Sequence, residues 1–175
     1  DWKLASETTG EQYDPATAKS SRELLDRLFE GSREIRECSE EGLKLISELY
    51  VQEVRLCEMF GNSRPEEGSE HYFAYCLEYL TRRPYIHGQL IALAVLLTSL
   101  HQGRPAVEIA ARLDEMNVAY HPKQVGVTFG EIERTLLDLP QYLDEERQLP
   151  YGIYHHKGMN ENRAAELIEA FSQML

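Results

Sequence analysis

The sequence predicts a mostly α-helical protein, with a helical amino-terminal region packed on a carboxy-terminal helical module that contains a short β-hairpin. Three observations support this prediction. Apolar residues recur at helical spacing over most of the chain, and the stretch from Leu90 to Leu100 is apolar on every side of a helix. Between Tyr142 and Tyr154 the pattern changes to two short runs around a charged turn, which is typical of a hairpin. With 175 residues, 42% of them hydrophobic, the chain can bury a sizeable core.

The amino-terminal part divides into two segments. Residues 1–20 are rich in Ser, Thr, Gly and Glu and predict a flexible arm. Residues 21–82 form a helical region with a helix from about Arg22, a long amphipathic helix over 33–60, and an aromatic-striped helix after Ser69. The long helix is a candidate partner surface, and packing against the central helix is the alternative. Its candidate contact residues are Ile35, Leu45, Leu49 and Val54.

Residues 83–157 form the predicted module. Its first helix is the apolar stretch, which we expect to be the central core helix, because it has no polar face to turn to water. Two more helices follow, over about 105–117 and 128–139, and Pro140 is expected to end the second. The predicted hairpin comes next. A last helix, within 158–175 and beginning near Asn160, carries an apolar stripe that must dock on the rest of the protein.

The order of elements over about 88–157 resembles the winged helix-turn-helix superfamily. The resemblance rests on Val107-Glu108-Ile109-Ala110-Ala111-Arg112-Leu113, which looks like the second helix of such domains, and on Ile132-Glu133-Arg134-Thr135-Leu136-Leu137 at the place of the third. The segment 118–127 departs from the family, since it is longer than the usual tight turn. An irregular helical bundle with a hairpin is the alternative. The resemblance implies that the third helix enters the DNA major groove.

Charge disfavours that DNA-binding use. The chain has 18 basic and 30 acidic residues, a net charge of −12, and the candidate third helix offers Glu131, Glu133 and Asp138 against Arg134. Such a balance repels phosphate backbones. A protein-binding use of the module is therefore favoured. DNA binding stays as the first alternative, provided that four basic residues share one face: Lys123, Arg134, Arg147 and Lys157.

A second alternative is a ribonuclease. Arg82 is separated by four residues from His87 at a predicted helix junction, which resembles the motif of helical HEPN ribonucleases. The resemblance implies that His87 transfers a proton and that Arg82 stabilises phosphate. The family pattern has a polar residue after the Arg, where this chain has Arg83 before Pro84. A salt bridge or cap at the helix junction is the competing interpretation.

No metal or cofactor is predicted. His155 and His156 are neighbours on the expected hairpin and point to opposite faces, so they are not expected to share a metal. Three cysteines are too few for a disulfide framework and favour the cytoplasm. The apolar stretch is shorter than the roughly 20 residues that a bilayer needs, and no export signal is visible. We therefore expect a non-enzymatic intracellular adaptor or regulatory subunit that binds a protein partner or its own copies, with no membrane and with nucleic acid disfavoured.

Overall fold

The computed structural model describes all residues 1–175 and is built from helices alone. The mostly helical prediction is confirmed. The elements are α1 (Trp2–Thr9), α2 (Pro15–Glu30), α3 (Ser32–Arg36), α4 (Glu40–Phe60), α5 (Ser69–Thr81), α6 (His87–Gln102), α7 (Ala106–Glu115), α8 (Pro122–Val125), α9 (Phe129–Gln141), the π-helix η1 (Tyr142–Glu146), α10 (Ile153–Lys157) and α11 (Glu161–Ser172). None of these helices has both the length and the hydropathy needed to cross a bilayer.

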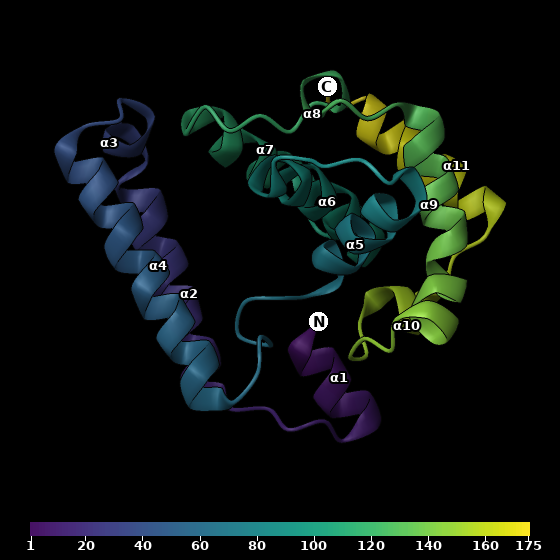
Figure 1. Cartoon of the computed structure of the whole chain (residues 1–175), viewed down its shortest axis with the longest axis horizontal. Helices are drawn as coiled ribbons and strands as arrows, with labels where there is room; N and C mark the ends of the chain where they lie inside the picture. The colour runs from purple at the N-terminus through teal and green to yellow at the C-terminus, as the bar shows by residue number, and fades with distance from the viewer.

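The body of the protein is a bundle in which α6 is the central helix (Figure 1). Helices α5, α7, α8, α10 and α11 all contact it, and α9 packs on α5 and α11. A single cluster of 23 buried residues, running from Tyr72 to Phe171, fills the bundle, and it includes Leu90, Leu93, Leu96 and Leu97 of α6. The predicted role of the apolar stretch as the core helix is confirmed. Its end is also as expected, because Gly103 adopts the left-handed conformation (φ 79°) that closes the helix.

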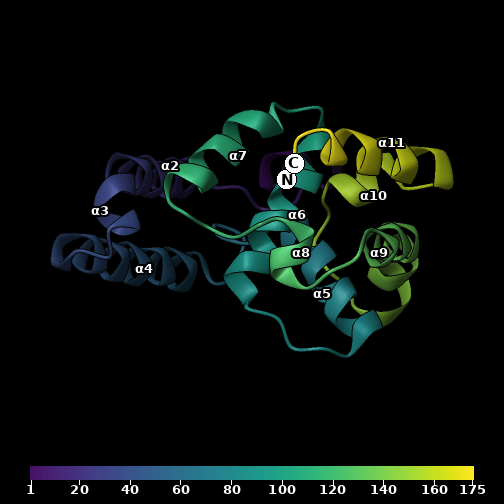
Figure 2. The ribbon, with the colours of Figure 1, turned by 90° about the horizontal axis from the view of Figure 1, so that it is seen from above.

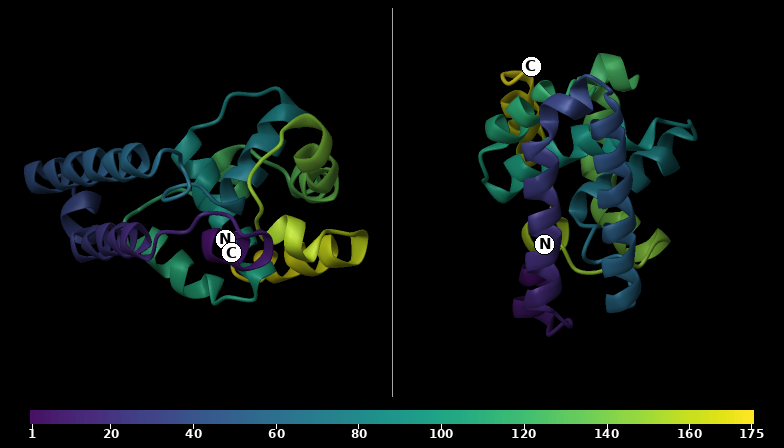
Figure 3. Two further views of the ribbon diagram at one scale, coloured as in Figure 1. Left: turned by 90° about the horizontal axis from the view of Figure 1, so that it is seen from below. Right: turned by 90° about the vertical axis from the view of Figure 1, so that its left-hand side faces the viewer.

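Helices α2 and α4 form an antiparallel hairpin that stands beside the body (Figures 2 and 3). We call α2, α3 and α4 the helical hairpin. The sequence predicts one long helix over 33–60, but the structure has two helices there, α3 and α4. The chain breaks at Cys38, which adopts φ 50°, and Ser39 caps the new helix by accepting a hydrogen bond from the Gly42 amide. A glycine is required at position 42 for α3 and α4 to lie this close together. A Cβ at Gly42 would collide with the Glu34 carbonyl, so the absence of a side chain lets α3 fold back on α4.

The predicted β-hairpin over 142–154 is wrong. Helix α9 continues past Pro140 and widens into η1, and the second predicted strand is the helical turn α10. Tyr142 and Leu143 are both buried, which a strand exposed on one face would not allow for neighbours. Their apolar character therefore reflects packing against the core. Without the hairpin, the module has no wing.

The segment 1–20, predicted as a flexible arm, contains α1 and the start of α2. The reason is Trp2, which is buried between Tyr13 and Phe60 with ring centroids 4.9 Å and 4.6 Å away. Its indole N–H donates to the Gln12 carbonyl over 2.8 Å. One aromatic anchor thus holds a polar segment against the end of α4.

Candidate functional site

Two histidines from different helices face each other at one end of the body. His71 lies in the first turn of α5 and His87 is the first residue of α6. Their ring centroids are 5.4 Å apart with the planes tilted by 46°. His71 is 7% exposed, whereas His87 is exposed. A molecule in solution therefore reaches the pair from the side of His87. We call Glu70, His71 and His87 the histidine site.

Glu70 orients His71 and tunes its proton affinity. The Glu70 carboxylate lies 2.9 Å from Nδ1 of His71 and also accepts the Gly68 amide over 2.7 Å. Burial disfavours the charged imidazole, but the hydrogen bond and charge of Glu70 outweigh burial and raise the pKa of His71 above 6.5. Burial likewise opposes the charge on Glu70, yet the bond to His71 holds its pKa below the ordinary value. Each partner therefore stabilises the charged form of the other.

More carboxylates surround the site. Glu66 and Glu67, in the loop before α5, add to the rise in the pKa of His71. Glu53 of α4 is close enough to be affected by His71, and burial together with the charge of Glu66 raises the pKa of Glu53. The local potential is therefore negative. Such a site attracts a proton or another cation and repels a phosphate group.

The loop that carries Glu66 and Glu67 is fastened by the buried Arg64. Its guanidinium donates to both Glu11 oxygens at 2.6 Å and 3.1 Å, to the Tyr72 hydroxyl at 3.0 Å, and to the Tyr151 carbonyl at 2.5 Å. Because Arg64 is only 5% exposed, losing Glu11 would leave its buried charge without an ion-pair partner. The loop, the segment between α1 and α2, α5 and the segment before α10 are thus tied together around one side chain.

Asp1 fastens the start of α5. Its carboxylate accepts the Ser69 amide over 2.5 Å and the Ile153 amide over 3.1 Å. Ser69, fully buried, accepts the same Ile153 amide through its hydroxyl at 3.0 Å. The first turn of α5 therefore has fixed partners on both sides, which holds His71 in place.

The histidine site is suited to proton transfer. The buried imidazole of His71 is held by a carboxylate and lies against a second, exposed imidazole, an arrangement that suits a proton acceptor within reach of solution. Two imidazoles are also donors for transition metals, and a carboxylate behind one of them is common in metal sites. No group of three or more His, Cys, Asp or Glu side chains in the chain has a metal-binding arrangement.

Of the predicted catalytic residues, His87 belongs to this site and Arg82 has a different role. The Arg82 guanidinium stacks over the Tyr79 ring, 4.4 Å from its centroid, at the end of α5. Sequence reasoning missed His71 as the partner of His87. A Glu-His pair at the start of a helix, directly after a loop, was the available signal, but only the fold shows that the two helix starts meet.

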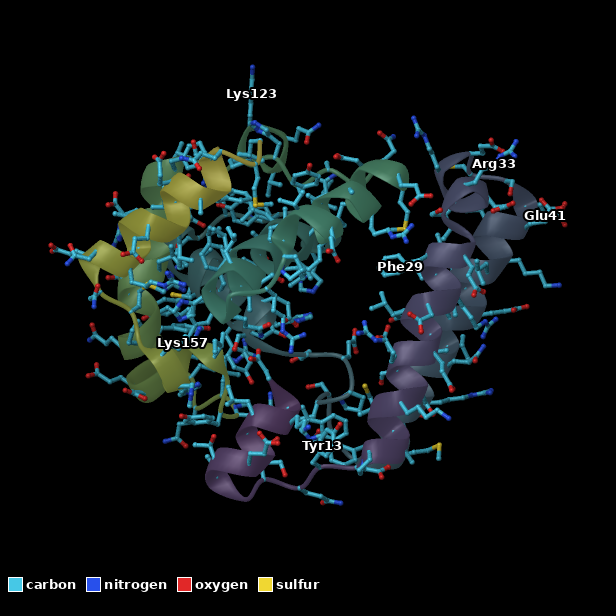
Figure 4. The ribbon with its side chains drawn as sticks, turned by 180° about the vertical axis from the view of Figure 1, so that it is seen from behind. Tyr13, Phe29, Arg33, Glu41, Lys123 and Lys157 are labelled. Carbon is cyan, nitrogen blue, oxygen red and sulfur yellow. The ribbon has the colours of Figure 1, made fainter.

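Three of the four basic residues predicted for the DNA-binding alternative have separate partners, and the fourth, Lys123, lies apart from them. Arg134 pairs with Asp138 at 3.4 Å, Arg147 stacks 3.9 Å from the Tyr75 ring centroid, and the Lys157 ammonium donates to the His101 carbonyl over 2.8 Å. Lys123 projects from α8 at an extremity of the molecule, away from Lys157 (Figure 4). His155 accepts the Gly152 amide and so caps α10.

The predicted partner residues lie mainly inside the helical hairpin. Leu49 is buried, Leu45 lies against Gly31, and Ile35 and Val54 are half-buried. The exposed apolar side chains of α4 are different ones: Leu43, Ile46, Tyr50, Val51 and Met59.

Comparison with known proteins finds relatives over much of the chain, although no protein-family model matches it. A protein of Metallosphaera sedula is 30% identical over 136 residues, which is 78% of this chain and 39% of that protein. A protein of Saccharolobus solfataricus is 27% identical over the same shares, and one of Thermoplasma acidophilum is 25% identical over 97% of this chain and 47% of its own length. All three are named glycerol-1-phosphate dehydrogenase [NAD(P)+].

The chain spans less than half the length of these relatives. A match of 136 residues in a chain of 175 contains residues 40–136 wherever it begins, so the histidine site lies within the region of similarity. The names of the relatives are those of enzymes, which runs against the expectation of a non-enzymatic adaptor.

Proposed function

We propose that this chain is the helical part of a dehydrogenase that oxidises glycerol 1-phosphate with NAD(P)+, and that His71 and His87 are its proton-transferring residues. The observation that carries the proposal is the contact of the two imidazoles at the end of the body where α5 and α6 begin. Their ring centroids are 5.4 Å apart. Similarity to three proteins named for this reaction supports the choice of substrate.

The reaction defines what these residues must do. When an alcohol is oxidised, its carbon gives a hydride to the nicotinamide, the C–O bond becomes a carbonyl, and the hydroxyl proton goes to a base. A base works best when its pKa lies near the working pH. Glu70 and its acidic neighbours raise the pKa of His71 above 6.5, which makes it a stronger base, and the exposed His87 lies between His71 and solution.

The charge of the site sets the orientation of the substrate. Glu66, Glu67 and Glu70 give the site a negative potential that stabilises the imidazolium formed when His71 accepts a proton, and that repels the phosphate. In this proposal the phosphate group of glycerol 1-phosphate points away from the histidine site. More than half of the length of the relatives lies outside the part that this chain matches. In this proposal, a region equivalent to that part holds the nicotinamide dinucleotide.

The test is steady-state kinetics of the full-length gene product with glycerol 1-phosphate and NAD+ or NADP+, followed by the absorbance of the reduced cofactor. His71→Ala and His87→Ala are expected to lower kcat by about a hundredfold or more, because general acid–base catalysis contributes roughly that much. His156→Ala is the matched control, since His156 is exposed and bonded only to the Tyr151 hydroxyl. Wild-type kcat in both site variants would refute the residue assignment, and absence of cofactor reduction would refute the substrate.

A further inference from the structure

Helix α5 carries a row of aromatic side chains that starts at the histidine site. His71, Tyr75 and Tyr79 follow one another at intervals of four residues, so they lie along one face of the helix. The ring centroids of His71 and Tyr75 are 5.9 Å apart, with the planes tilted by 53°. We call these three residues the aromatic row. It connects the histidine site to the surface along α5.

A guanidinium lies over each tyrosine of the aromatic row. Arg147 is 3.9 Å from the Tyr75 ring centroid, and Arg82 is 4.4 Å from the Tyr79 ring centroid. Stacking on a ring holds the planar guanidinium in place and leaves the N–H donors around its edge available to a ligand. Because Tyr75 is the ring that contacts His71, Arg147 is one ring away from the histidine site and Arg82 is two rings away.

The charge of Arg147 has no carboxylate partner in the chain. Its side chain is exposed and takes part in none of the ion pairs. The two carboxylates before it have other neighbours: Glu145 accepts a hydrogen bond from the Gln141 side chain over 2.7 Å, and Glu146 faces the Tyr79 hydroxyl. The guanidinium is therefore held in position with its charge unpaired, which is what an anion-binding residue needs.

We infer that Arg147 binds the phosphate group of the substrate. The inference rests on the proposed function, in which the carboxylates of the histidine site repel that phosphate and a cation elsewhere must hold it. A guanidinium donates two parallel N–H bonds to a phosphate, which makes Arg a selective partner for it. A three-carbon phosphate ester with a hydrogen bond of about 3 Å at each end is long enough to join His71 to Arg147 past Tyr75.

Kinetics of the full-length gene product with and without the phosphate on the substrate provide the test. Arg147→Gln is expected to lower kcat/KM for glycerol 1-phosphate roughly tenfold or more, because it removes a hydrogen bond between charged groups. The values of kcat/KM for glycerol and of KM for NAD+ and NADP+ are expected to stay unchanged. Arg82→Gln is the matched control, since it removes a stacked guanidinium one ring further from His71.

Two kinetic results would overturn the inference. An equal kcat/KM for glycerol 1-phosphate in Arg147→Gln and wild type would remove Arg147 from the substrate and leave the dehydrogenase assignment standing. A rise in the KM of the cofactor alone would assign Arg147 to a phosphate of the nicotinamide dinucleotide instead.

A binding measurement separates this inference from the proposed function, because it needs no turnover. Isothermal titration calorimetry with inorganic phosphate is expected to show binding by the wild type and by Arg82→Gln, and binding at least about tenfold weaker by Arg147→Gln. Circular dichroism is expected to show the same helix content in all three proteins. This pattern in a protein that reduces no cofactor would refute the dehydrogenase and keep Arg147 as a phosphate site. Equal phosphate affinity in the three proteins, or no binding by the wild type, would overturn the inference.

Discussion

Helices α2 and α6 are both 16 residues long, yet α6 buries nine of its residues and α2 buries none. The difference separates the two regions of the molecule. The body is held by a continuous apolar core that reaches from α5 to α11. The helical hairpin contributes nothing to that core and is joined to the body by contacts of α3 with α7 and by a few polar bonds, such as Ser32 to Glu115 at 2.9 Å. The histidine site is built on the body, at the start of α5 and of α6.

The largest predicted effect is the cost of a cavity in the body. Leu93→Ala removes a fully buried side chain from the middle of α6 and is expected to lower the free energy of unfolding by about 2–5 kcal/mol. Leu25→Ala on α2, where the side chain is 36% exposed, is expected to cost less than about 1 kcal/mol. Urea unfolding followed by circular dichroism compares them. Equal losses would show that the hairpin and the body share one core.

A second prediction concerns pH, because the body holds a histidine that must stay neutral. His101 is fully buried and stacks on Tyr154 with ring centroids 5.1 Å apart. Burial, with Arg163 and Lys157 close by, lowers its pKa from 6.5 to about 4. The unfolded chain binds this proton more readily, so the free energy of unfolding falls as pH drops through 6.5 and has lost about 3 kcal/mol once pH is below 4.

The variant His101→Phe keeps an aromatic ring against Tyr154 and has no proton to bind. We expect a flatter dependence of the free energy of unfolding on pH between 6.5 and about 4 than in the wild type, measured by urea unfolding at each pH. A slope as steep as that of the wild type would show that another group causes the loss of stability in acid.

The sequence was a good guide where periodicity alone determines an element. The helices α5, α6, α7, α9 and α11 lie close to where the apolar stripes and caps predict them, with Thr128 and Asn160 as side-chain caps of the last two. The failures come from tertiary effects. Pro140 was expected to end α9, but packing of Tyr142 and Leu143 in the core carries the helix into η1. The break at Cys38 depends on a φ of 50°, which no local pattern shows.

Recognition of the site failed for a related reason. His87 was singled out because Arg82 precedes it, yet the fold places it against His71, a residue of another helix that no short motif joins to it. Periodicity correctly marked α4 as amphipathic, but it cannot tell which side of α4 meets α2, where the buried Leu49 lies. Both cases depend on which elements meet in three dimensions.

The pH dependence of kcat/KM in the full-length gene product tests the central claim most directly, because it reports the free enzyme's essential base. Glu70 raises the pKa of His71, so removing its charge lowers that pKa. Glu70→Gln, which keeps an oxygen for the Gly68 amide, is therefore expected to move the acid limb of the profile to lower pH and to reduce its plateau. An acid limb at the same pH in wild type and variant would contradict the assignment of His71 as the base.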